Sequence, residues 1–148
     1  MNYPFLSGII RLFLPAILML ICIETPLHAD NTNDIVVVVN KKFPSSRLSV
    51  TDVRRIFRKE ITTWKGTSVK PIHALAGSKL RQLFTGKALG VTEAADQKYW
   101  QDMKLKKGMR APMELSNNVR AVFSIPGAIT YCYRKDFNPA TASIVLVL

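Results

Sequence analysis

The stretch PIHALAGSKLRQLF (residues 71–84) contains four residues whose groups could bind an oxyanion: Gly77, Ser78, Lys79 and Arg81. The run before Gly77 is apolar, and the apolar residues after it are spaced three and four apart, which predicts a strand that passes into a helix. Backbone N–H groups at a helix start, a hydroxyl and two cations are suitable donors for phosphate or sulfate. The same residues also fit a plain capped turn, so two interpretations stand at this point.

No group of residues typical of an enzyme accompanies this stretch. After residue 29 the chain has one histidine, His73, and one cysteine, Cys132, and shows neither a nucleophile elbow nor a paired acid motif. One His and one Cys do not make a metal site. Cys132 lies inside the strand-like run AITYCYR, where a free cysteine usually behaves as a small buried hydrophobe. We therefore predict a non-enzymatic protein with no catalytic residue, metal or cofactor.

The first 29 residues have the pattern of an export signal. Arg11 precedes a short apolar core, residues 12–23, and the polar segment that follows ends at Ala29 with an acceptable cleavage site. A membrane-spanning helix needs about 20 apolar residues, more than lie between Arg11 and Glu24. We expect a cleaved signal (1–29), one periplasmic domain (30–148) and no membrane span.

The net charge of +11 favours anionic partners. Cleavage after Ala29 leaves this charge unchanged, because it removes one arginine and one glutamate. A small oxyanion, an acidic protein and an anionic membrane surface all fit such a charge. Export, scattered basic residues and the lack of a zinc-finger or aromatic RNA-binding signature argue against nucleic acid.

The apolar patterns predict one α/β domain with a mixed or mainly parallel sheet flanked by helices. Residues 104–112 (KLKKGMRAP) are expected to form a loop, and the last run, ASIVLVL, either a strand or a tethered tail. The expected elements are strands at residues 34–40, 69–75 and 128–134, and helices that begin after Ser49, Ser78, Thr92 and Ser116.

Four segments, in this order and spacing, resemble the phosphate-binding proteins of ABC transporters: DIVVVVN, LSVTDVRRIF with ITTW, PIHALAGSKLRQLF, and IPGAITY. The resemblance runs from Asp34 to about Tyr133. It is strongest to the short members of that family that carry an export signal. It implies a single lobe of a type II periplasmic-binding-protein-like fold.

The chain departs from the family at the ligand turn. Where the family has Arg-x-Asp-Gly-Ser-Gly-Thr, this chain has Ala74 at the arginine position and Ala76 at the aspartate position. Lys79 and Leu80 replace the following Gly and Thr, so only Ser78 and the backbone frame carry over. Without the aspartate, the site has no evident way to distinguish phosphate from sulfate. Thr130 replaces a family glycine and is expected to crowd the backbone there.

The resemblance therefore implies an exported solute-binding-like protein that interacts with an inorganic oxyanion, phosphate or sulfate, in connection with ABC transport. A single lobe offers an open ledge rather than a cleft, so binding by the monomer is expected to be weak. The alternative is a periplasmic interaction or sensory accessory module with a decayed ligand site. Its partner would be an envelope transporter or sensor, with Trp64, Tyr99, Trp100 and the KLKKGMR segment as contacts. Core packing is the competing role for both tryptophans, more so for Trp100.

Overall fold

The structure is a computed structural model that describes residues 31–44 and 47–148. The expected signal segment and its cleavage site lie outside these residues. The described strands are β1 (Ile35–Asn40), β2 (Thr63–Trp64), β3 (Thr67–Ser68), β4 (Lys70–Ala74), β5 (Met113–Leu115), β6 (Ala128–Tyr133) and β7 (Ala142–Val147). The described helices are α1 (Val50–Phe57), α2 (Lys79–Phe84), the π-helical η1 (Thr85–Leu89), α3 (Glu93–Lys107), α4 (Asn118–Ser124) and the 3₁₀ turn η2 (Arg134–Asp136).

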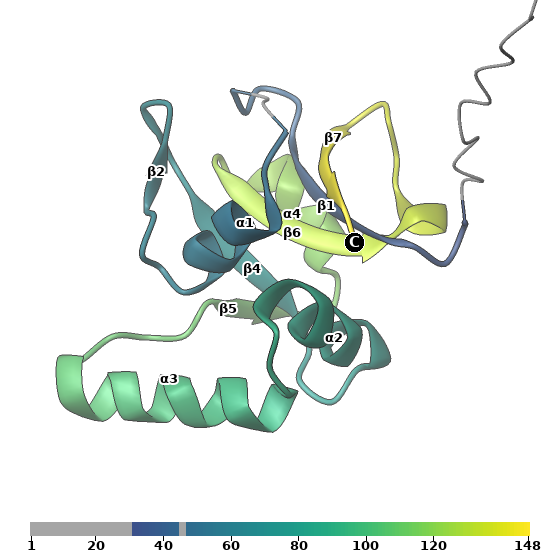
Figure 1. Cartoon of the computed structure of the whole chain (residues 1–148). Helices are drawn as coiled ribbons and strands as arrows, with labels where there is room; N and C mark the ends of the chain where they lie inside the picture. Colours follow the sequence, from purple (N-terminus) through teal and green to yellow (C-terminus); the bar gives the residue numbers. More distant parts are fainter. Residues whose placement is uncertain (1–30, 45–46) are drawn as a thin grey trace, which may run out of the picture.

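The five-stranded sheet is mixed, with the order β5-β4-β6-β1-β7 (Figure 1). β4 runs parallel to β5 and β6, whereas β1 runs antiparallel to β6 and β7. Each parallel pair is joined through helices, as parallel strands require. The α/β class with a mixed sheet is thus confirmed, and the last run is the edge strand β7. β2 and β3 form a separate hairpin, which the sequence patterns did not predict.

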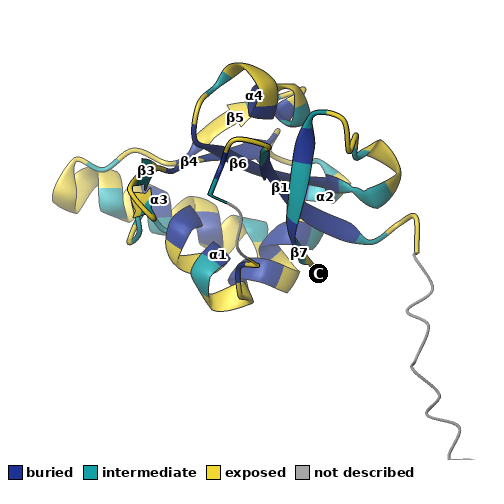
Figure 2. Cartoon of the chain, turned by 90° about the horizontal axis from the view of Figure 1, so that it is seen from above, coloured by how far each residue is buried: buried dark blue, intermediate teal, exposed yellow. Residues whose placement is uncertain are grey.

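Helices cover both faces of the sheet, and β1 shows why its sequence is a continuous apolar run. Val37 and Val39 pack with α1 and with Phe84 of α2, whereas Val36 and Val38 pack with Val122 of α4. Figure 2 shows α4 on one side of the buried sheet and α1 on the other. A strand covered on both faces needs apolar side chains in both orientations. β1 is therefore the centre of the core.

Two helix boundaries differ from the predictions, beyond shifts of one residue at strand ends. α3 continues through the lysines that were expected to begin a loop and ends at Gly108, whose φ is 64°. Lysine is a good helix former, and cations are favourable at a helix C-terminus, so the basic run extends the helix. Asn117, not Ser116, caps α4, because the Asn117 side chain accepts a hydrogen bond from the backbone N–H of Arg120.

Two predictions about β6 have different outcomes. Cys132 is buried, as expected, and burial raises the pKa of its thiol to about 12. The expected crowding at Thr130 is wrong: its hydroxyl donates to Ile72 O at 2.8 Å and accepts from Asn118 Nδ2 at 2.7 Å. The Thr130 side chain therefore links β4, β6 and α4.

Candidate anion site

The turn between β4 and α2 has the local geometry that the sequence predicted. Gly77 adopts a left-handed conformation with φ of 78°, which favours glycine. Ser78 is the N-cap of α2: its hydroxyl accepts from the backbone N–H of Arg81 at 3.2 Å and donates to Leu75 O at 2.7 Å. These two bonds hold the loop and the start of α2 in one arrangement.

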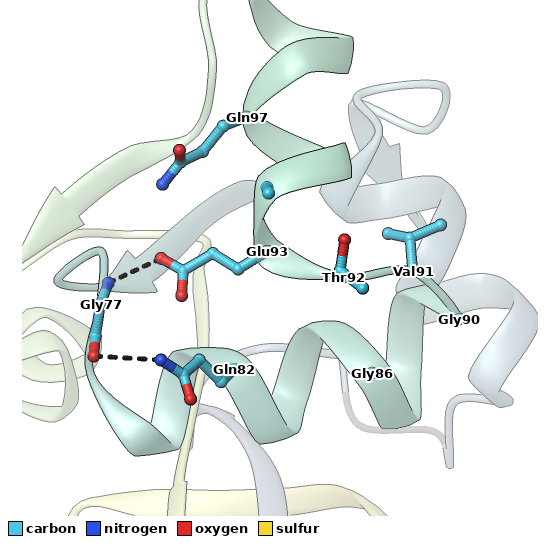
Figure 3. Close-up of a pocket in the computed structure, with 9 residues that line it drawn as sticks. Gly77, Gln82, Gly86, Gly90, Val91, Thr92, Glu93 and Gln97 are labelled. Carbon is cyan, nitrogen blue, oxygen red and sulfur yellow. Dashed lines mark hydrogen bonds between the residues drawn. The ribbon is translucent and has the colours of Figure 1, made fainter.

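The N–H group of Gly77 donates to the carboxylate of Glu93, with 2.7 Å between Gly77 N and Glu93 Oε1. Figure 3 shows the Glu93 side chain reaching from the first turn of α3 towards Gly77, while Gln82 donates to the Gly77 carbonyl. Thr92 caps α3 and fixes the start of the helix that carries Glu93. The Gly77 N–H therefore already donates a hydrogen bond to an oxyanionic group of the chain itself, the Glu93 carboxylate.

An open hollow of about 850 Å³ lies beside this contact. Of the four residues predicted to bind an anion, only Gly77 lines it. Its lining residues come from the β4–α2 turn, α2, η1 and the start of α3: Gly77, Gln82, Gly86, Gly90, Val91, Thr92, Glu93, Ala94 and Gln97. The hollow has the volume of a small-molecule site, but Glu93 places a negative charge in it.

Arg81 and Lys79 lie in different surroundings. Lys79 is exposed beside the turn, whereas Arg81 is only 2% exposed. Arg81 Nη2 lies 2.9 Å from Asp96 Oδ2, and Arg58 Nη1 lies 3.1 Å from Asp96 Oδ1. Burial raises the pKa of Asp96, although the two guanidinium groups oppose this shift. The structure therefore ties the Arg81 guanidinium to an internal carboxylate and does not join it to the hollow beside Gly77.

The contacts of Glu93 and Asp96 were not predicted from the sequence. One signal was present for Asp96: it lies four residues before Trp100, and residues four apart share a helix face. Trp100 is 5% exposed and Trp64 is half-buried, so the stronger expectation of core packing for Trp100 is confirmed. Glu93 lies on α3, 16 residues after Gly77. This spacing gives no indication in the sequence that the two residues are in contact.

A buried polar and aromatic cluster supports the turn from below. His73 Nδ1 lies 3.1 Å from Tyr131 Oη, and the Ala74 N–H donates to the same hydroxyl at 3.2 Å. The rings of Tyr131 and Phe84 stack with their centroids 3.7 Å apart. Burial raises the pKa of Tyr131 to about 12, although nearby Arg81 opposes this shift. β4, β6 and α2 are therefore joined directly beneath the loop that carries Gly77.

Neither a metal site nor a transmembrane helix is found in the described part of the chain. No group of three or more His, Cys, Asp or Glu side chains in residues 31–44 and 47–148 could hold a metal ion. Within the same ranges, no helix combines the length and apolar character needed to cross a bilayer.

Residues 31–143 match the family model described as the PBP superfamily domain, and the chain belongs to that superfamily. Its fold is similar to the crystal structure of an ABC-type phosphate transport receptor from Vibrio cholerae, with a TM-score of 0.57 and 16% sequence identity. The similarity covers 76% of this chain and 45% of the receptor, so the chain spans less than half of that protein. A comparison with curated proteins finds no match. The solute-binding fold is thereby established.

Proposed function

We propose that this chain is an exported solute-binding protein that binds an inorganic oxyanion, phosphate or sulfate, at the Gly77 amide and Lys79, in the turn that Ser78 caps. The observation that carries the proposal is the 2.7 Å hydrogen bond from Gly77 N to a carboxylate oxygen of Glu93. A carboxylate and a phosphate offer the same kind of charged acceptor to a backbone N–H. The turn therefore already holds one oxyanionic group, which a ligand would replace.

Two features decide how strongly such a ligand binds. Lys79 is exposed beside the turn and adds a cation that attracts an anion. Glu93 opposes binding, because it occupies the Gly77 amide and its charge repels the ligand. With Ala74 and Ala76 at the two family contact positions, phosphate and sulfate are expected to compete on similar terms. Binding by the wild-type lobe is therefore weak and sensitive to salt.

The test is a calorimetric titration with phosphate and with sulfate at low ionic strength. Glu93→Gln keeps the size of the side chain but removes its charge, so both anions are expected to bind about tenfold more tightly or better. Lys79→Ala is expected to weaken binding. Glu60→Gln and Lys98→Ala are the matched controls, because each removes one charge from an exposed residue outside the hollow.

A blank titration of folded Glu93→Gln at millimolar anion would disprove the binding function. Equal effects of Glu93→Gln and Glu60→Gln would also contradict it, because the response would then follow only the net charge.

The second function is a periplasmic interaction or sensory accessory module that serves an envelope transporter or sensor. The observation that favours it is the ion pair of Arg81 with buried Asp96, which withdraws one of the predicted ligand cations. This function predicts no saturable heat with either anion. It also predicts retention of a transporter or sensor subunit by the immobilised mature protein, which charge reversal of the exposed lysines of α3 would reduce.

A further inference from the structure

A second groove, of about 510 Å³, lies between α3 and the segment that leads into β5. Four side chains of α3 line it: Gln97, Trp100, Gln101 and Lys104. Their spacing places them on one face of the helix. Arg81 of α2 also lines this groove. The groove shares only Gln97 with the hollow beside Gly77, so it is a separate place on the surface.

The buried part of the groove contains hydrogen-bond donors without acceptors. Arg81 is 2% exposed and Trp100 is 5% exposed. Arg81 Nη2 pairs with Asp96, but Arg81 Nε and Nη1 and Trp100 Nε1 have no hydrogen-bond partner among the described residues. An unsatisfied buried donor costs about 1–3 kcal/mol. A ligand that brings acceptor oxygens to these atoms would remove this cost.

The charges around the groove also favour an anion. Arg58 and Arg81 share the single carboxylate of Asp96, which leaves one positive charge of this cluster uncompensated by Asp96. The charge of Glu93 raises the pKa of Asp96, but less strongly than either arginine lowers it. Glu93 Oε1 accepts a hydrogen bond from Gly77 N.

The mouth of the groove adds further cations. Exposed Lys104 and Arg110 contribute two positive charges, and Glu114 is the only carboxylate among the described residues that line the groove.

We propose that this groove binds a small polyanion that carries at least two carboxylate or phosphate groups. One group accepts hydrogen bonds from Arg81 and Trp100 at the base, and a second group meets Lys104 and Arg110 at the mouth. Glu114 suits a ligand hydroxyl, from which it can accept a hydrogen bond. Binding here does not depend on the oxyanion function proposed for Gly77.

The test follows the fluorescence of Trp100. Trp64→Phe leaves Trp100 as the only tryptophan, and this protein is titrated with citrate and with pyrophosphate, and with inorganic phosphate for comparison. At least one of the two larger anions is expected to cause a saturable change in emission, at a lower concentration than inorganic phosphate. Titration calorimetry measures the same affinities independently. The absence of a saturable change with both citrate and pyrophosphate would overturn the proposal.

Variants then locate the site. In the Trp64→Phe background, Lys104→Gln with Arg110→Gln is expected to weaken binding at least about tenfold, because two direct contacts are lost. The matched control, Lys106→Gln with Lys107→Gln, removes the same charge from exposed residues that do not line the groove, and is expected to change affinity less than about threefold through screening. Equal weakening by the two pairs would overturn the proposal.

Arg81→Lys tests the base of the groove, because it keeps a cation near Asp96 but removes the guanidinium donors. It is expected to weaken binding in the same way. If it does not fold, the Lys104 and Arg110 pair still decides the question. Glu93→Gln tests whether the two sites are separate, with Trp100 emission as the readout of this groove. Because Glu93 does not line the groove, the variant is expected to change the citrate and pyrophosphate affinity seen at Trp100 by less than about threefold, the effect of one nearby charge. A change in affinity as large as that of the Lys104 and Arg110 pair would overturn the assignment to a separate groove.

Discussion

At the scale of single residues, His73 shows how the core limits protonation. The side chain is fully buried, and its Nδ1 contacts the Tyr131 hydroxyl. Burial lowers the pKa of His73 well below its ordinary value of 6.5, and the positive charges of Arg81 and Arg58 lower it further. A proton on this imidazole would place a third cation close to two guanidinium groups. The folded protein therefore keeps His73 neutral.

Stability is consequently expected to fall as the pH drops below 6.5, because the unfolded chain then takes up a proton that folded His73 does not bind. The limiting slope from one such group is about 1.4 kcal/mol per pH unit. The free energy of unfolding, measured with urea between about pH 7.5 and 5.5, tests this. His73→Gln is expected to reduce the slope in that interval, whatever it does to stability at pH 7.5. Identical slopes for the two proteins would contradict the assignment.

At the scale of elements, local patterns were sufficient for β1, α1, β4 and the start of α2. In each case the signal lies within a few neighbouring residues: a β-branched run, or a cap followed by apolar residues at helical spacing. The direction of the Arg81 side chain could not be predicted in this way. It depends on Asp96 of α3 and on Arg58, the residue that caps the C-terminus of α1. β5 was also missed, because it has three residues and its pairing with β4 is long-range.

Gly127 illustrates the same limit in the turn that leads into β6. The sequence places it between α4 and β6, but not against another part of the chain. Its φ is 76°, and a Cβ atom there would lie 1.9 Å from the backbone oxygen of Ser68. The Gly127 carbonyl also accepts from Lys70 N at 2.8 Å. The turn is therefore packed against the connection between β3 and β4 with no room for a side chain.

Gly127→Ala is expected to destabilise the fold severely, because it adds a backbone clash to the strain of a left-handed alanine. Gly108→Ala is the matched control: Gly108 has a similar φ of 64°, but no atom lies within 4 Å of its added Cβ. The control should lose about 1–2 kcal/mol, and Gly127→Ala at least about 2 kcal/mol more, or fail to fold. Urea unfolding measures both. Equal losses would show that the turn moves away from Ser68 at little cost.

At the scale of the whole molecule, the five-stranded sheet and its helices enclose a hydrophobic core in a chain that matches 45% of a phosphate transport receptor. The two anion sites proposed above, at Gly77 and in the Arg81 groove, lie on hollows that the described residues leave open. Weak binding, or binding completed by another protein, follows from this geometry. Either kind of binding requires the domain to be in the compartment that contains the anion or the partner protein.

Export is therefore part of the proposed function, and its prediction concerns residues before the described domain. β1, the first element among the described residues, begins at Ile35, so cleavage after Ala29 would leave it intact. The protein isolated from the periplasm is expected to begin with Asp30, as measured by mass spectrometry of the intact chain. A small residue is needed at the cleavage position, so Ala29→Phe should block processing and leave uncleaved protein in the membrane fraction. Wild-type protein that keeps Met1 in that fraction would show instead that the apolar run of residues 12–23 is retained as an anchor.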